Sequence, residues 1–551
     1  GRLNVAELSA ALPGYVNVAM KGRVLNAMDP KRLAGDLQIA GHINNVDFIK
    51  PTVLDAKLAK EVNIPPMTLD GRMSLAGTTY KGNLTATTGS GRLALDGYWQ
   101  GSTEGYDITL STDSFPVNSF MPTLGVGTVT ADIKARGQRL DPASPQMKLD
   151  ADATIHHIVY DTRPYHDIHA WASLDKGLIH GGIVSLNTYA DFDIELEGRI
   201  DGETYTFDID GDVRDLNLVG LNLSPTESRG SMTLHADGTA TPAKSLYDVA
   251  FDVSDLEWHM PDTKIASHRL AGTFTATDST TLADLSERDL SVKFAAFCPL
   301  DTLLGRLTRV SAVLDSQMTQ RKVDVDAFQR ALPRFNLAVN GAGNNIVTDY
   351  LAGSDMGLQS LTLNARNDSL IAFGAQVEEF HTGATRLDTL TFRAIQHGKF
   401  LVYNATMNNR RGTLDDFAHV NARGYLANDK LGLFIKQRNI ADSIGFNVGM
   451  LATMGDSIVT VKFTPYRPTI GYKPWTVTED NFIAYNLYTR HVDADLRMSS
   501  AQSKLNLYTE HNPATLGQED VILQIADVQI ADWLSFSPFA PPLAGILSTN
   551  L

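Results

Sequence analysis

A seven-residue pattern, with glycine at both ends and alternating apolar residues between them, constrains this chain most. It occurs at residues 35–41, 71–77 and 91–97, which read GDLQIAG, GRMSLAG and GRLALDG. Alternation with a period of two gives a β-strand one apolar face and one water-facing face, and glycine gives the backbone the freedom to turn. The recurring pattern therefore predicts a repeated strand, and hence a long sheet with one apolar side.

The same alternation fills most of the chain. Short glycine-containing turns separate the strands, and the clearest are Lys176-Gly177, Asp201-Gly202, Asp210-Gly211 and Asp237-Gly238. Consecutive strands that are joined by short turns pair in the antiparallel sense. We expect roughly 25 to 30 such strands, at about 4.8 Å each, in an elongated and curled antiparallel β-groove.

A helical segment interrupts the strands after Pro299. Leu303, Leu307, Val310 and Leu314 recur at spacings of three and four, which indicates an amphipathic helix, with Asp301 or Thr302 as its N-cap. A second helix is expected from Val325 to Leu332, where Pro333 ends it. The chain therefore divides into a repeating β-groove segment (residues 1–298), an amphipathic helical insertion (299–333) and a second β-groove segment (334–551). The fold class is all-β with a short helical insertion.

Composition excludes several functions. The net charge of -16 and the pI near 5.3 argue against a nucleic-acid partner, because phosphate binding needs clustered cations. One cysteine, Cys298, permits no internal disulfide. No stretch reaches the roughly 18 apolar residues of a membrane helix. We interpret the chain as an internal fragment of a longer protein.

Candidate metal and catalytic motifs are incomplete. His166 and His169 have a metal-ligand spacing, but on a strand they lie on opposite faces. The acidic segment 208–212 resembles a calcium loop, yet Val219 stands where the closing Glu belongs. Neither a serine elbow nor a phosphate-binding loop occurs. We expect no metal site, no cofactor and no enzymatic activity.

The apolar face needs a cover, which could be a second sheet, a curl of the same sheet or a ligand. A lipid tail of about 16 carbons costs on the order of 13 kcal/mol to expose to water, at about 0.8 kcal/mol per CH₂, so a continuous apolar trough removes most of that barrier. The side chains expected to line the groove are Phe192, Ile194, Leu196, Met232, Leu234, Leu496, Met498, Leu505 and Leu507. Those of the helix expected at its mouth are Leu303, Leu307, Val310 and Leu314.

The chain resembles a known family in four segments. These segments are Pro474-Trp475-Thr476-Val477, Asp480-Asn481-Phe482-Ile483, the alternating run Val492 to Leu496, and Pro541 to Gly545 at the start of a new repeat. Together with the glycine-bounded strands, they are similar to the TamB branch of the AsmA-like superfamily in its Bacteroidetes form. The resemblance implies a taco-shaped groove in the periplasm that conducts phospholipids between the inner and outer membranes. It also implies an inner-membrane anchor, which this sequence lacks, and an outer-membrane barrel partner of the BamA type. The family supplies no catalytic residues.

Three alternatives remain at this point. A structural or adhesive repeat protein would seal its apolar faces as a sandwich. A scaffold for outer-membrane protein assembly would pair its strand edges with unfolded barrel strands. A parallel β-helix enzyme fits less well, because the turns here come too often for coils of about 20 or more residues.

Overall fold

The computed structural model describes residues 2–12, 15–26, 28–29, 31–45, 61–139, 144, 146–411, 417–511, 519–534 and 543–551. Two compact units divide the chain. Unit 1 comprises residues 1–243 and 249–261, and unit 2 comprises residues 244–248 and 262–551. Pro541 and Pro542, which the family resemblance includes, lie outside the described residues.

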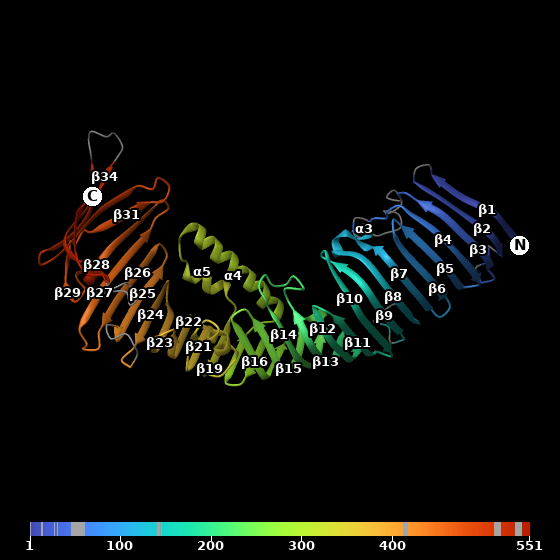
Figure 1. Ribbon diagram of the computed structural model, residues 1–551, viewed down its shortest axis with the longest axis horizontal. Helices are drawn as coiled ribbons and strands as arrows, with labels where there is room; N and C mark the ends of the chain where they lie inside the picture. Colours follow the sequence, from blue (N-terminus) through green and yellow to red (C-terminus); the bar gives the residue numbers. More distant parts are fainter. Residues whose placement is uncertain are drawn as a thin grey trace. The chain divides into compact units, whose positions relative to one another are not determined.

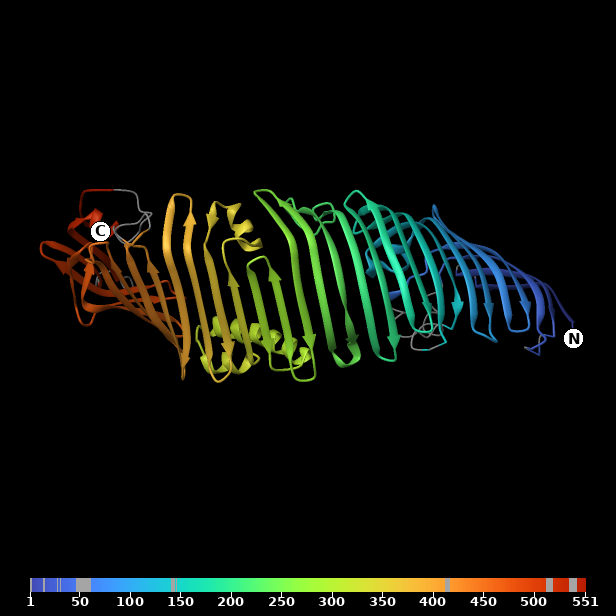
Figure 2. The ribbon, with the colours of Figure 1, turned by 90° about the horizontal axis from the view of Figure 1, so that it is seen from below.

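Unit 1 is a meander of strands in which each strand from β1 to β13 pairs with the next along the chain (Figure 1 and Figure 2). Its strands are β1 (Arg2–Leu12), β2 (Val16–Leu25), β3 (Ala34–Ile43), β4 (Met67–Ala76), β5 (Thr79–Thr88), β6 (Gly91–Gln100), β7 (Gly105–Pro116), β8 (Val126–Gln138), β9 (Lys148–Tyr160), β10 (Arg163–Asp175), β11 (Leu178–Asn187), β12 (Ala190–Asp201), β13 (Thr204–Asn217), β14 (Arg229–Thr241) and β15 (Leu246–Met260). Short helical turns are α3 (Val117–Phe120), η1 (Pro122–Leu124) and η2 (Pro242–Lys244).

Unit 2 continues with strands and adds helices. Its strands are β16 (Thr263–Ala276), β17 (Thr281–Glu287), β18 (Leu290–Ala296), β19 (Phe335–Gly341), β20 (Met356–Gly357), β21 (Ser360–Asn367), β22 (Ile371–Thr382), β23 (Thr385–His397), β24 (Phe400–Asn408), β25 (His419–Ala427), β26 (Lys430–Arg438), β27 (Ile444–Met454), β28 (Ile458–Ile470), β29 (Lys473–Pro474), β30 (Thr476–Val477), β31 (Phe482–Asn486), β32 (Val492–Ser500), β33 (Ser503–His511), β34 (Glu519–Gln529) and β35 (Ile546–Asn550). Its helices are α4 (Leu300–Gln320), α5 (Val325–Ala331), α6 (Ile346–Ala352) and α7 (Ile530–Leu534).

The expected fold class is confirmed. The structure is 67% strand and 11% helix, and its antiparallel sheet is not closed. The described residues form 35 strands, more than the roughly 25 to 30 expected at about 4.8 Å each. Three of them, β20, β29 and β30, contain only two residues, and alternation over so short a stretch gives no detectable pattern.

The glycine signals have two different meanings. Lys176 and Gly177 turn between β10 and β11 with positive φ values of 51° and 79°, so this predicted hairpin is confirmed. Gly202 makes the same kind of turn between β12 and β13. The predicted turns at Asp210-Gly211 and Asp237-Gly238 are wrong, because both pairs lie inside strands.

A strand glycine on the apolar face leaves space for its neighbours. A Cβ atom at Gly211 would lie 3.4 Å from Ile194 Cγ1 and 3.7 Å from Leu234 Cβ, which belong to the two adjacent strands. Five glycines of the seven-residue pattern also lie within strands, at positions 35, 41, 71, 91 and 97. They belong to the repeated surface of the sheet and not to its turns.

The two predicted helices are present as α4 and α5. Pro299 occupies the N-cap position of α4 and gives no side-chain cap, so the expected cap at Asp301 or Thr302 is wrong. Asp301 lies in the first turn instead, where it accepts a hydrogen bond from Ser245 Oγ at 2.8 Å. Asp324 caps α5 by accepting from Ala327 N at 2.8 Å.

A closed hydrophobic core occupies the C-terminal strands of unit 2. Its buried members are Ile470, Trp475, Val477, Leu496, Met498 and Val528. Leu496 and Met498 are 5% and 4% exposed, and Trp475 packs edge-on against Trp533 with ring centroids 5.6 Å apart. The expectation that Leu496 and Met498 line an open groove is wrong, since these side chains are covered. Leu505 and Leu507 pack against the same core and are partly buried.

This core predicts a local stability effect. Trp475→Ala should remove about 3–5 kcal/mol of local stability, because it empties a fully packed site. The result should be a loss of amide hydrogen-exchange protection in β28 to β34.

Ile440→Ala is the matched control, since Ile440 is 56% exposed in a turn of the same unit. Its effect should stay within about 0.5 kcal/mol. Equal loss of protection in the two variants would show that Trp475 is not part of a packed core.

Candidate functional site

One row of directly opposed residues crosses unit 1 from β2 to β14. In an antiparallel sheet opposed residues share a face, so strand pairing alone places this row on one side. From β14 to β2 the row reads Leu234, Gly211, Ile194, Ile183, Ala170, Ala153, Ile133, Leu110, Leu95, Leu84, Gly71, Ile39 and Met20. Every member is apolar or glycine.

Two flanking rows widen this row into a band. One flanking row runs Met232, Val213, Phe192, Ser185, Ile168, Ile155, Ala131, Thr112, Leu93, Ala86, Leu69, Gly41 and Val18. The other runs Ala236, Ile209, Leu196, Gly181, Ala172, Ala151, Ala135, Ile108, Gly97, Gly82, Met73, Leu37 and Gly22. We call the three rows the apolar band of unit 1. The structure brings together five predicted groove residues in it, namely Phe192, Ile194, Leu196, Met232 and Leu234.

The apolar band of unit 1 is not the interior of a sandwich. Apart from its two glycines, every residue of the central row is half-buried. Side chains covered by a second sheet would be almost fully buried, as Leu496 is in the closed core of unit 2. Within the described part of unit 1, neighbouring side chains shelter the band but no second layer covers it.

The opposite face of unit 1 is polar and acidic. Glu195, Asp210 and His235 are directly opposed on β12, β13 and β14. The histidines that were weighed as metal ligands lie beside carboxylates: His169 on this face is 2.8 Å from Asp152, and His166 is 2.8 Å from its chain neighbour Asp167. These exposed pairs explain the clustering of histidines through solvation and ion pairing.

Asp208, Asp210 and His235 are the group of ligand atoms that comes nearest to a metal site among the described residues. All three side chains are exposed, and His235 Nδ1 lies 2.9 Å from Asp210 Oδ1. Asp237 approaches the other ring nitrogen at 3.6 Å. Hydrogen bonds and ion pairs within the group account for this arrangement.

Unit 2 carries a corresponding apolar band of two rows. One row, from β16 to β28, reads Phe274, Ala283, Phe294, Leu337, Ala365, Phe373, Ala394, Tyr403, Gly424, Leu433, Met450 and Phe463. The other, from β16 to β27, reads Gly272, Leu285, Val292, Val339, Leu363, Ala375, Phe392, Ala405, Ala422, Ile435 and Val448. Phe463 and Val448 pack against the closed core, so the apolar band of unit 2 ends there.

Helices border this band on both sides. Asn367 and Gln396 belong to the same face of β21 and β23, one position beyond the band, and both bind α5 and the residues after it. Gln396 Nε2 donates to Asp326 Oδ1 at 3.2 Å, and Asn367 Nδ2 donates to Pro333 O at 2.8 Å. At the other ends of the strands, buried Glu287 accepts from Ile346 N at 3.0 Å at the start of α6.

A hollow of about 300 Å³ opens on the apolar band of unit 2. Its side chains on this face are Ala375, Val377, Leu390, Phe392, Ala405, Met407, Val420 and Ala422. No charged side chain lines it. The hollow is therefore concave, and its lining is mostly apolar.

The four helical residues expected at the groove mouth have different environments. Leu303 is buried, at 6% exposure, and Val310 is half-buried. Leu307 and Leu314 remain 48% and 43% exposed. α4 is fixed to α5 through Arg306 Nη1, which donates to Arg330 O and Leu332 O at 3.1 Å each (Figure 1). Only Leu303 therefore contributes to a packed interior.

Sequence reasoning missed most of the apolar band of unit 2. Phe294 and the other aromatic members were not predicted to line the groove, and the alanine and glycine members were not recognised as parts of a face. Counting alanine and glycine as compatible with an apolar face would have extended the alternation through β25, which reads HVNARGYLA.

No protein-family model matches the chain, and a comparison with curated proteins found no match. In the described part of the chain, no helix combines the length and apolar content needed to cross a membrane.

The acidic face generates a pH prediction. The hydrogen bond to Asp210, helped by the charges of Asp208, Asp210 and Asp237, raises the pKa of His235 above its ordinary value. A raised folded-state pKa means that protonation stabilises the fold. This contribution is complete below the unfolded pKa of about 6.5 and is lost as pH rises through the higher folded-state value.

NMR titration of labelled histidines should place the His235 midpoint above about 6.5. Asp210→Asn should lower that midpoint, whereas Asp212→Asn should leave it nearly unchanged because Asp212 pairs with Arg214. A wild-type midpoint at or below the ordinary value would contradict this electrostatic account.

Proposed function

We propose that this chain conducts phospholipid acyl chains along its apolar bands, as part of a protein that bridges the inner and outer bacterial membranes. The single observation that carries the proposal is the unbroken central row of unit 1, which passes through thirteen strands without one polar side chain. A sheet stabilised only by its own packing has no need of an uncovered apolar row of this length.

The length of the band favours a path over a pocket. Thirteen strands have twelve spacings, and at about 4.8 Å each they extend about 58 Å. One leaflet of a bilayer has a hydrocarbon depth of about 15 Å, half the thickness of the core. The band is therefore about four times as long as one lipid tail, and a site for a single ligand would not need this length.

The energetics permit movement along the band. Transfer of a 16-carbon tail into water costs on the order of 13 kcal/mol, and contact along one side recovers roughly half of it, on the order of 6 kcal/mol. The same kind of apolar surface is repeated at every strand. A tail that moves by one strand therefore loses apolar contacts on one side and gains similar ones on the other. Phospholipid headgroups would remain in water beside the band.

The location and partners follow from the family resemblance. We place the chain in the periplasm, with an inner-membrane anchor supplied by the remainder of the protein. An outer-membrane barrel protein of the BamA type would receive its far end. No chemical step is required, which agrees with the proposal that the protein is not an enzyme and uses no cofactor.

The rival hypotheses fit the exposed band less well. A sandwich repeat should bury its apolar faces, and the half-buried central row of unit 1 argues against such a closure. A strand-pairing scaffold would act through the free edges of the sheet, so it gives no reason for an apolar face.

A charge within the band should interrupt lipid binding. We predict that Leu234→Arg lowers crosslinking of phospholipid to a photoreactive residue at position 194 at least about 10-fold, since a guanidinium group without a partner keeps its water and excludes a tail. The two positions are separated by one strand in the central row.

Thr233→Arg is the matched control, because it makes the same charge change on the acidic face of the same strand. Crosslinking should remain at the wild-type level there, and circular dichroism should show both variants folded. Equal crosslinking in wild type and folded Leu234→Arg would refute the conduit.

A further inference from the structure

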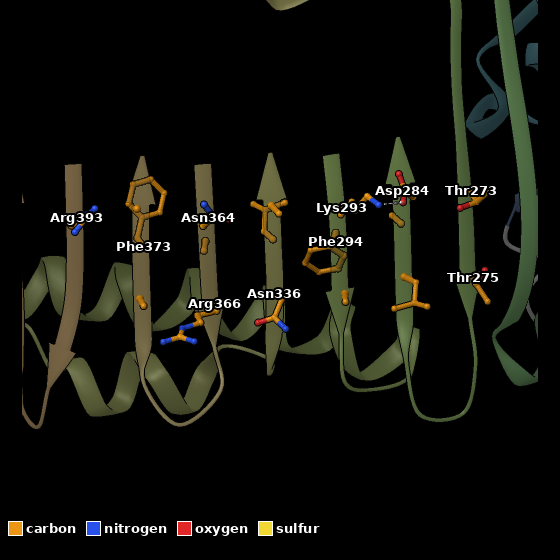
Figure 3. A pocket seen from close by; sticks show the side chains of 18 of the residues that line it. Thr273, Thr275, Asp284, Lys293, Phe294, Asn336, Asn364, Arg366, Phe373 and Arg393 are labelled. Carbon is orange, nitrogen blue, oxygen red and sulfur yellow. Dashed lines mark ion pairs between the residues drawn. The ribbon is translucent and has the colours of Figure 1, made fainter. Parts of the chain in front are cut away.

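A second hollow in unit 2 lies on the face of the sheet opposite to its apolar band. It has a volume of about 730 Å³ and extends across β16 to β23 (Figure 3). α5 and the residues after it bind the apolar side of the sheet through Asn367 and Gln396. Because the helices lie behind the strands in Figure 3, the face toward the viewer is the polar one. We call this hollow the polar furrow.

Strand register shows which face carries the polar furrow. Its walls are two rows of directly opposed residues, both alternating with the apolar band. One wall reads Thr273, Asp284, Lys293, Ala338, Asn364, Gly374 and Arg393, and the other reads Thr275, Leu282, Ala295, Asn336, Arg366, Ala372 and Ile395. The furrow crosses seven strands, or about 29 Å at six spacings of about 4.8 Å.

Cations dominate the charge along this face. Lys293 forms an ion pair with Asp284 at 3.5 Å (Figure 3). Arg366 forms an ion pair with Asp368 at 3.7 Å. Arg393 has no ion pair or side-chain hydrogen bond within the described residues. Arg423 follows it two strands further on, opposite Asn404, and is likewise unpaired within the described chain.

This positive charge is unusual for the chain. The whole sequence has a net charge of -16, and the corresponding face of unit 1 carries carboxylates at Asp193, Glu195 and Asp210. The charge on the polar face therefore changes sign between the units. Unpaired guanidinium groups in an acidic protein form a local site of positive potential, which attracts anions.

We propose that the polar furrow binds an anionic oligosaccharide, whose carboxylate or phosphate groups pair with Arg366 and Arg393. Guanidinium groups bind both kinds of anion in a bidentate manner. Asn336, Asn364 and Thr273 present amide and hydroxyl groups that match sugar hydroxyls.

The shape and chemistry of the furrow favour a sugar chain over a peptide. A peptide that adds to a sheet pairs with a free edge, and the furrow lies on a face whose backbone groups are already bonded within the sheet. A folded protein partner would favour large aromatic anchors. Phe294 and Phe373 also border this hollow, but by strand alternation they belong to the apolar band on the other face. The walls themselves include the small residues Ala295, Ala338, Ala372 and Gly374, which leave room for an elongated polar chain.

The test is calorimetric titration of the full chain with three probes. These are a galacturonic acid hexamer, a deacylated bisphosphorylated glucosamine disaccharide, and neutral maltohexaose. We expect at least one anionic probe to bind and maltohexaose not to bind, with an affinity that falls as salt is added. Binding of only the hexamer identifies carboxylate as the recognised group, and binding of only the disaccharide identifies phosphate.

The double variant Arg366→Gln with Arg393→Gln should weaken binding of the anionic probe at least about 10-fold. The double variant Arg72→Gln with Arg92→Gln changes the net charge equally on exposed strand positions of unit 1, and it should retain wild-type affinity. The proposal is overturned if neither anionic probe binds, if maltohexaose binds as tightly, or if both double variants lose affinity equally. Lipid crosslinking to unit 1 is measured separately, so either function can fail alone.

Discussion

Antiparallel register is the constraint on which the rest of the structure depends. Neighbouring strands pair so that opposed residues share a face, and one apolar position then determines its neighbour across the sheet. A slip of one residue would move a polar side chain into the row in most strands, as Asp193 or Glu195 would replace Ile194 in β12. The bulge between Thr130 and Ala131 on β8 shows that irregularities occur, yet Ile133 still opposes Ala153 and the row continues.

The two faces of the sheet are distinct in chemistry and in proposed role. In both units one face is a band of apolar and small residues, and its covering is incomplete. The opposite face carries acids and histidines in unit 1, and in unit 2 it carries Arg393 and Arg423, which have no ion-pair partner among the described residues. The closed core around Trp475 is the exception, because it buries side chains that would otherwise extend the band of unit 2. A lipid that follows this band would have to leave it before β28, or displace that core.

The sequence permitted prediction of the all-β class, the antiparallel pairing and the two helices. It also placed Phe192, Ile194 and Leu196 on the correct face, because strict alternation over a strand has only one interpretation. It failed for Leu496 and Met498, which alternate in the same way but are buried by Trp475. Alternation reports which side chains share a face, and only tertiary packing determines what covers that face.

Glycine was the other source of error. The dipeptide Asp210-Gly211 is locally typical of a turn. In the structure it lies inside β13, where Gly211 occupies the position between Ile194 and Leu234 on the two adjacent strands. The polar furrow could not be found from the sequence either, since its walls combine residues from seven strands whose register is set by turns and by the helical insertion.

The most direct test of the central claim is a scan with a photoreactive amino acid along the central row of unit 1. Positions 84, 110 and 183 lie in the row, and their neighbours 85, 111 and 184 lie on the opposite face. After irradiation in cells, mass spectrometry should find phospholipid adducts at all three row positions and none at the neighbours. Adducts that are absent from the row, or equally frequent on both faces, would contradict a continuous lipid path.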